Sequence, residues 1–155
     1  MLIYKLNNQD IDVANNIRKV FYDSYSVEAK ILKAVDFPPL TRSLVEYIQT
    51  DTVFYGCHKD NLLAGVIEIR DCDNKIHIQS LVVDPLFFKQ GAASKLMTFV
   101  LDNFNSEHLF VETGIDNIPA IQLYEKFGFK QVKQWLTNHG IIKVKLVKNT
   151  SFKIT

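Results

Sequence analysis

A cluster of small residues stands at positions 91–94, with the sequence Gly-Ala-Ala-Ser, where a strand-like run passes into a helical pattern. The first N–H groups of a helix have no partners inside the helix, and the helix dipole places partial positive charge on them. Phosphate binds at such an end when no side chain blocks its approach, and Lys89 and Lys95 are near enough in sequence to add positive charge. The segment therefore indicates either an anion-binding site or an ordinary loop whose small residues let the helix pack closely.

Other motifs with a defined chemistry are missing from the sequence. The nucleotide-binding patterns G-x-x-x-x-G-K-[ST] and G-x-G-x-x-G do not occur, and neither does the serine hydrolase pattern G-x-S-x-G. Residues 71–74 match a calcium-binding loop only at its start, because the glycine and the closing glutamate are absent. Cys57 and Cys72 lie in no metal-ligand spacing, so we expect two reduced thiols and no metal site.

The composition is typical of a folded globular protein. The chain has 155 residues, of which 47% are hydrophobic and 23% charged, and we predict one domain over residues 1–155. A formal net charge of +1 gives no general attraction to nucleic acid or to a membrane surface, so neither is an expected partner. The N-terminus lacks the pattern of a signal peptide, and no run approaches the ~20 apolar residues that span a bilayer. We therefore expect a cytoplasmic protein.

Hydrophobic periodicity predicts the elements that position the small-residue cluster. Alternating or continuous apolar runs predict strands at residues 2–6, 52–58, 62–70, 75–83, 108–114, 129–135 and 140–148. Helical spacing predicts helices at residues 10–25, from about 42 with Thr41 as the cap, from 91 to 104, and at 117–127. Short turns between the second, third and fourth strands favour antiparallel hairpins. The order of elements predicts an α/β or α+β sheet with helices on its faces.

Two segments together resemble the GCN5-related N-acetyltransferase (GNAT) family. In residues 81–97, Val83 and Pro85 match the family's V-x-P, and Gly91 and Ala93 match the end of its pattern [RQ]-x-x-G-x-[GA], with Phe88 where the arginine or glutamine usually stands. Residues 117–129 fit the pattern N-x-x-A-x-x-L-Y-E-K-x-G-F. The residues that match it are Asn117, Ala120, Leu123, Tyr124, Glu125, Lys126, Gly128 and Phe129. The order of elements also fits, which implies a GNAT-like mixed, mostly antiparallel sheet of about seven strands with helices on both faces.

The resemblance implies that acetyl-coenzyme A is the co-substrate, with no metal. In that family, backbone N–H groups of the loop after the fourth strand hold the pyrophosphate. They correspond here to Lys89, Gln90, Gly91, Ala92, Ala93 and Ser94. The pantetheine lies in the gap between splayed fourth and fifth strands, which implies contacts with Leu81, Val82 and Val83 and a polar contact with Asn117.

The resemblance also implies that Tyr124 contacts the cofactor and acts as the general acid. In the family reaction an amine attacks the thioester carbonyl, and coenzyme A leaves as a thiolate. A thiol titrates near ~8.5 and a phenol near ~10, so a hydrogen bond to the developing thiolate is easier than full transfer of the phenol proton. Many members place a glutamate as the base where this sequence has Gln79. His77, Glu68, Glu112 and a water chain remain as alternatives.

The resemblance also implies that the acceptor pocket lies between the first two helices and the last hairpin. The residues expected there are Tyr22, Tyr25, Phe37, Trp135 and His139. This set favours an apolar or aromatic amine, on a small molecule or peptide, and family members often form homodimers. An alternative is a non-catalytic acyl-coenzyme A sensor, which Phe88 and Gln79 favour because both depart from the family pattern.

Overall fold

The computed structural model describes residues 1–104 and 107–149. The strands are β1 (Leu2–Leu6), β2 (Val53–Lys59), β3 (Leu62–Cys72), β4 (Lys75–Val83), β5 (His108–Gly114), β6 (Lys130–Leu136) and β7 (Ile142–Asn149). The helices are α1 (Ile11–Leu32), α2 (Leu44–Gln49), α3 (Ala92–Asn103) and α4 (Ile118–Lys126), with short 3-10 helices η1 (Pro38–Thr41) and η2 (Pro85–Phe87). Residues 150–155, which the predicted domain includes, lie outside the described part of the chain.

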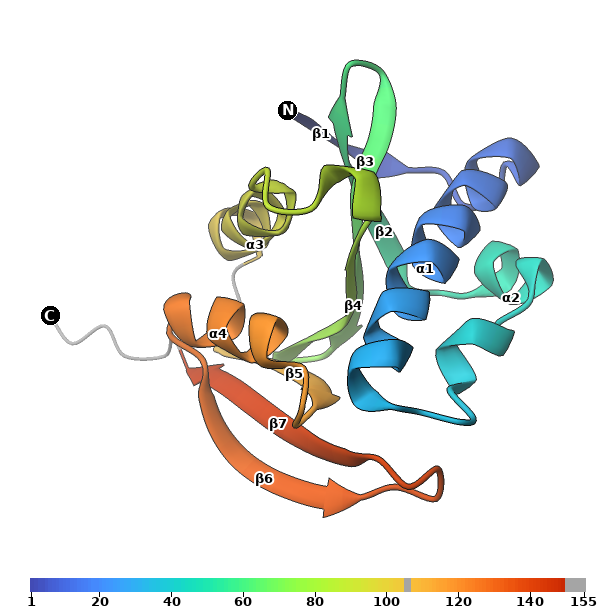
Figure 1. Cartoon of the computed structure of the whole chain (residues 1–155). Coiled ribbons are helices and arrows are strands. Elements are labelled where there is room, and N and C mark those ends of the chain that lie inside the picture. The colour runs from blue at the N-terminus through green and yellow to red at the C-terminus, as the bar shows by residue number, and fades with distance from the viewer. Residues whose placement is uncertain (105–106, 150–155) are drawn as a thin grey trace, which may run out of the picture.

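One seven-stranded sheet organises the fold, with the strand order β1-β2-β3-β4-β5-β7-β6. All neighbouring strands pair antiparallel except β4 and β5, which are parallel and joined through α3 (Figure 1). A parallel pair needs a crossover of this kind, because the chain must return to the same end of the sheet. The prediction of a mixed, mostly antiparallel sheet is confirmed.

Helices cover both faces of the sheet, as predicted. Ile17 and Phe21 of α1 belong to the hydrophobic cluster on one face, together with Val66 of β3. Ile67, the next residue of β3, belongs with Leu96 of α3 to the cluster on the other face. Successive side chains of a strand point to opposite faces, so these two neighbours separate the two cores. No helix in the described part is both long and apolar enough to cross a membrane.

The first two helices differ from the prediction in their bounds. Helix α1 begins after Asp10, whose side chain accepts hydrogen bonds from backbone N–H groups as predicted, but it continues beyond Tyr25 to Leu32. Helix α2 is capped by Ser43 and not by Thr41. The reason is that the two prolines at positions 38 and 39 fix a short 3-10 turn, which includes Thr41, before the α-helix can begin.

β4 and β5 pair along only part of their length. Their parallel register runs from Lys75–His108 to Ile78–Val111, although β4 continues to Val83 and β5 to Gly114. A bulge between β3 and β4 falls at the same level: Glu68 pairs with Ser80 and Ile69 with Ile78, so Gln79 has no opposite residue. A bulge bends a strand and increases its twist. The two strands therefore diverge beyond Ile78, and their facing edges are left unpaired.

Candidate active site

The loop between β4 and α3 presents unpaired backbone N–H groups. Its backbone turns at Lys89 and Gly91, which have φ angles of 61° and 89°. Gly91 is the N-cap of α3 and offers no side-chain cap, and a Cβ built on it meets no atom within 4 Å. In the described part of the chain, no acceptor is found for the N–H groups of residues 89–94. The loop therefore keeps its donors and the approach to them open, which is what an anion requires.

Most of this loop lines one large cavity, with a volume of about 1410 Å³. Lys89, Gly91, Ala92, Ala93 and Ser94 all line it. The exception is Gln90, which is not among the lining residues and whose side chain is hydrogen-bonded to Lys59 and to the Leu86 carbonyl. The cavity extends from the start of α3 to α1 and the β6–β7 turn, so it has room for a cofactor and a second molecule together.

The diverging end of β4 forms one wall of the cavity. Leu81 and Val83 line it, whereas the Val82 side chain is 1% exposed and packs in the α1 core. Of the three contacts expected on this strand, the structure therefore directs two side chains to the cavity and one away from it. The alternation of the strand is the reason.

Tyr124, the residue expected to act as the general acid, lines the cavity from α4. Its side chain is 5% exposed, and no hydrogen-bond partner for its hydroxyl is found among the described residues. Burial raises the pKa of Tyr124 above the usual phenol range, and the nearby carboxylate of Glu28 raises it further. The phenol is therefore neutral at physiological pH, and its O–H is free to donate to a bound molecule.

Asn117 and Glu28 form a second polar pair in the same cavity. Asn117 caps α4 by accepting from the N–H of Ala120, and its amide donates to Oε1 of Glu28. Burial raises the pKa of Glu28, while the Asn117 hydrogen bond and the charge of Lys143 oppose this rise. The predicted site does not include Glu28, because the predicted first helix ends near Tyr25. The spacing of Phe21, Tyr25 and Glu28 at four and three residues was the signal for one continuous helix face.

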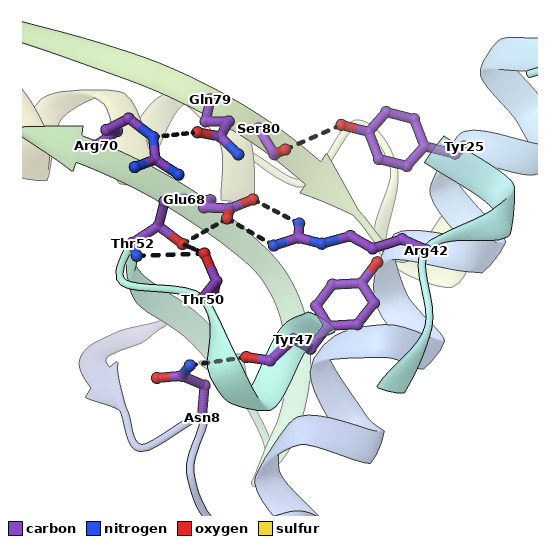
Figure 2. Close-up of polar contacts among 10 residues, drawn as sticks. All are labelled: Asn8, Tyr25, Arg42, Tyr47, Thr50, Thr52, Glu68, Arg70, Gln79 and Ser80. Carbon is purple, nitrogen blue, oxygen red and sulfur yellow. Dashed lines mark hydrogen bonds and ion pairs between the residues drawn. The ribbon is translucent and has the colours of Figure 1, made fainter. Parts of the chain in front are cut away.

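The predicted base candidates have different environments. Glu68 is completely buried, and both its carboxylate oxygens are occupied: Arg42 donates to them over 2.8 and 2.9 Å, and the Thr52 hydroxyl donates over 2.6 Å (Figure 2). His77 stacks on Phe110 with ring centres 4.4 Å apart, and burial lowers its pKa. Neither Glu68 nor His77 lines the cavity.

Glu112 and Gln79 do line the cavity. Glu112 lies on β5 next to the diverging edge, so the structure keeps it as a candidate. Gln79, at the bulge of β4, accepts a hydrogen bond from Arg70 over 3.0 Å (Figure 2). An amide cannot take up a proton, so Gln79 is not a base even though its side chain borders the site.

Three of the five aromatic and histidine residues expected in the acceptor pocket line the cavity. Tyr25 donates a hydrogen bond to Ser80 and packs edge-on against Phe37, and His139 pairs with Asp36 over 3.1 Å. Tyr22 and Trp135 are not part of the lining. Tyr22 lies on the outward face of α1 and is 55% exposed, and Trp135 lies on β6 beneath the Lys133 ammonium.

Among the described residues, no three or more His, Cys, Asp or Glu side chains are arranged to hold a metal ion. Cys57 is buried, Cys72 is exposed, and both are free thiols.

The chain is similar in sequence and fold to known proteins. The model of the acetyltransferase (GNAT) domain matches residues 24–150. The UPF0157 protein YqkA of Bacillus subtilis is 28% identical over 142 residues, which are 91% of this chain and 41% of that protein. An N-alpha-acetyltransferase of Sulfolobus acidocaldarius is 40% identical over 63 residues, which are 38% of each. The matches thus span about two fifths of these curated relatives.

Solved structures share the fold at low sequence identity. The ribosomal-protein-S18-alanine N-acetyltransferase of Escherichia coli superimposes with a TM-score of 0.76 at 17% identity, covering 98% of this chain and 95% of that one. The PaiA N-acetyltransferase of Thermoplasma acidophilum, in complex with coenzyme A, superimposes with a TM-score of 0.70 at 16% identity, covering 94% and 98%. With the domain model matching most of its length, the chain belongs to the GNAT acetyltransferase family, and its cavity is the candidate active site of an acyltransferase domain.

Proposed function

We propose that the protein transfers an acetyl group from acetyl-coenzyme A to an amine of a small molecule or peptide, by direct attack within a ternary complex. One observation carries the proposal: the backbone N–H groups of Lys89 and residues 91–94 and the hydroxyl of Tyr124, which have no partner among the described residues, line one cavity. The backbone N–H donors suit the diphosphate of the cofactor. The Tyr124 hydroxyl suits the thiolate that leaves at the other end of the cofactor. The names of the Sulfolobus relative and of the coenzyme A complex support this reading.

The cofactor would be held mainly by backbone groups. The N–H groups of residues 89–94 would donate to the diphosphate, helped by the dipole of α3. The unpaired edge of β4 beyond Ile78 would accept and donate hydrogen bonds along the pantetheine arm, next to Leu81 and Val83. Phe88 also lines the cavity, and as an apolar side chain it adds contact area but no charge for the phosphates.

The chemistry needs a neutral amine and a stabilised thiolate. The amine nitrogen forms a bond to the thioester carbonyl carbon, the C–S bond breaks, and the electron pair leaves with sulfur. Burial makes a Tyr124 phenolate costly, so the phenol would donate its proton to sulfur only while it receives the proton released by the new amide nitrogen. The hydroxyl is thus a relay that never carries a full charge.

Thiol release tests the proposal directly. Purified protein would be mixed with acetyl-coenzyme A and a panel of alkyl, aryl and peptide amines, with the cofactor titrated in parallel by calorimetry. Acetyl transfer predicts amine-dependent thiol release. Tight cofactor binding with no release on any amine would instead favour an acyl-coenzyme A sensor, a role that the departures at Phe88 and Gln79 support. No heat with coenzyme A at millimolar concentration would contradict both functions.

A further inference from the structure

Glu28 has a carboxylate oxygen without a partner inside the cavity. The residue lies on the inward face of α1, one turn after Tyr25. Its Oε1 accepts from the amide of Asn117, whereas Oε2 has no hydrogen bond or ion pair with any described residue. The side chain is half-buried, and a carboxylate oxygen that faces a cavity without a protein partner can accept a hydrogen bond from a bound molecule.

Glu28 borders the same cavity as Tyr124, the residue proposed to donate to the leaving sulfur. The titratable groups that face it are Tyr25 on its own helix, Tyr124 from α4 and Lys143 from β7, while Glu112 of β5 borders the same cavity. Glu28 and Tyr124 both line the cavity, and the charge of Glu28 raises the pKa of the Tyr124 phenol. Burial also raises the pKa of Glu28, which makes its carboxylate a stronger base.

We infer that Glu28 binds the ammonium group of the acceptor and takes its proton before the attack on the thioester. This inference rests on the proposed acetyl transfer. One N–H bond of the ammonium breaks and an O–H bond forms at Glu28 Oε2, which leaves a neutral amine. The second proton passes from nitrogen through Tyr124 to sulfur, and Glu28 returns its proton to water after the products leave. The acceptor is therefore an amine that is protonated in solution, such as a primary alkylamine.

The other acidic and basic groups fit this role less well. Glu68 is saturated by Arg42 and Thr52 and does not border the cavity. Glu46 borders it from the first turn of α2, but its side chain is exposed to solvent. Glu112 is the strongest competitor, because it borders the cavity from β5. The experiment must therefore distinguish Glu28 from Glu112 as the residue that takes the proton.

The test compares two acceptors with four proteins. An alkylamine needs to lose a proton before it attacks, whereas an arylamine of similar size is already neutral at pH 7. The proteins are the wild type, Glu28→Gln, Glu112→Gln and, as a matched control, Glu125→Gln, which changes an exposed glutamate of α4. A glutamine at position 28 still accepts from Asn117, so the local structure is preserved. Calorimetry with coenzyme A verifies that each variant is folded and binds the cofactor.

We expect Glu28→Gln to lower kcat/KM on the alkylamine by about 10²-fold or more while it changes the arylamine rate little. We also expect the rise of the alkylamine kcat/KM with pH to move in this variant toward the pKa of the free amine, near ~10.4, because only the neutral amine then reacts, whereas Glu125→Gln keeps the wild-type profile. Equal losses on both acceptors, an unchanged pH profile, or a selective alkylamine loss in Glu112→Gln instead would overturn the inference. Thiol release by the wild type distinguishes these outcomes from failure of acetyl transfer itself, which would show as no release with either amine and would overturn both.

Discussion

Arg42, which lines the cavity, forms a bidentate ion pair with Glu68, with nitrogen–oxygen distances of 2.8 and 2.9 Å. The guanidinium also lies over the ring of Tyr47, 4.2 Å from its centre (Figure 2). The Glu68 carboxylate is fully buried, and the Arg42 side chain is 17% exposed. Two charges held in this way fix the segment before α2 against the centre of the sheet, so Glu68 has a structural role.

Removing the positive partner should therefore destabilise the protein strongly. We expect Arg42→Met to lower the free energy of unfolding by about 3 kcal/mol or more, because it leaves the Glu68 carboxylate buried without its partner. The control is Asp51→Asn, which breaks the pair between Arg70 and an aspartate whose side chain is 83% exposed and should lower it by less than ~1 kcal/mol. Urea denaturation measures both. Similar losses of unfolding free energy in the two variants would show that the buried ion pair stabilises the protein no more than the exposed one.

Replacing the buried phenol tests its chemical role. We expect Tyr124→Phe to lower turnover by about 10²-fold with little change in coenzyme A affinity, because only the hydroxyl that relays the proton is lost. Tyr22→Phe is the control, since that hydroxyl lies on the exposed face of α1 and outside the cavity. Steady-state thiol release and calorimetry give the two quantities. Unchanged turnover in Tyr124→Phe would remove this residue from the mechanism.

Gly91, at the start of α3, should be needed for coenzyme A affinity in addition to any contribution that it makes to stability. We expect Gly91→Val to weaken coenzyme A binding, because a β-branched residue resists a φ of 89° and covers the open N–H groups. Gly140→Val imposes a comparable strain, at a φ of 76° with equally open space, in the β6–β7 turn. Calorimetry should show loss of affinity only for the Gly91 variant. Equal affinities in the two variants would argue against a phosphate contact at this helix start.

Glu28 should reduce stability as it ionises. A carboxyl whose pKa is raised by folding binds its proton more tightly in the folded state, so stability falls as the pH rises from the ordinary value of 4.5 through the raised value. We expect Glu28→Gln to be more stable than the wild type at pH 7, with the difference vanishing below pH 4.5. Thermal melts across this range measure the effect. Glu125→Gln should follow the wild-type curve, and parallel curves for all three proteins would contradict a raised pKa at Glu28.

The sequence by itself determined the order of elements and the parts of the site that depend on local spacing. Strands β1 and β5 have the predicted bounds because apolar alternation is a property of consecutive residues. The small residues at 91–94 indicate an open helix start for the same reason, since the unpaired N–H groups belong to the backbone. Asn117 and Tyr124 share one short motif, and the helix that the motif predicts brings both to the cavity.

Only the tertiary structure decided which distant side chains meet. Glu28 and Asn117 are 89 positions apart, and their contact depends on the packing of α1 beside the diverging ends of β4 and β5. Tyr22 and Tyr25 look alike in the sequence, yet the direction in which α1 crosses the sheet exposes Tyr22 and turns Tyr25 inward, where it donates to Ser80. The sequence leaves Glu68 as a candidate base, whereas the structure shows that Arg42 donates to both of its carboxylate oxygens. Local patterns fix backbone geometry, whereas the partner of a buried charge is set by how the layers pack, because either layer alone would leave that charge in water.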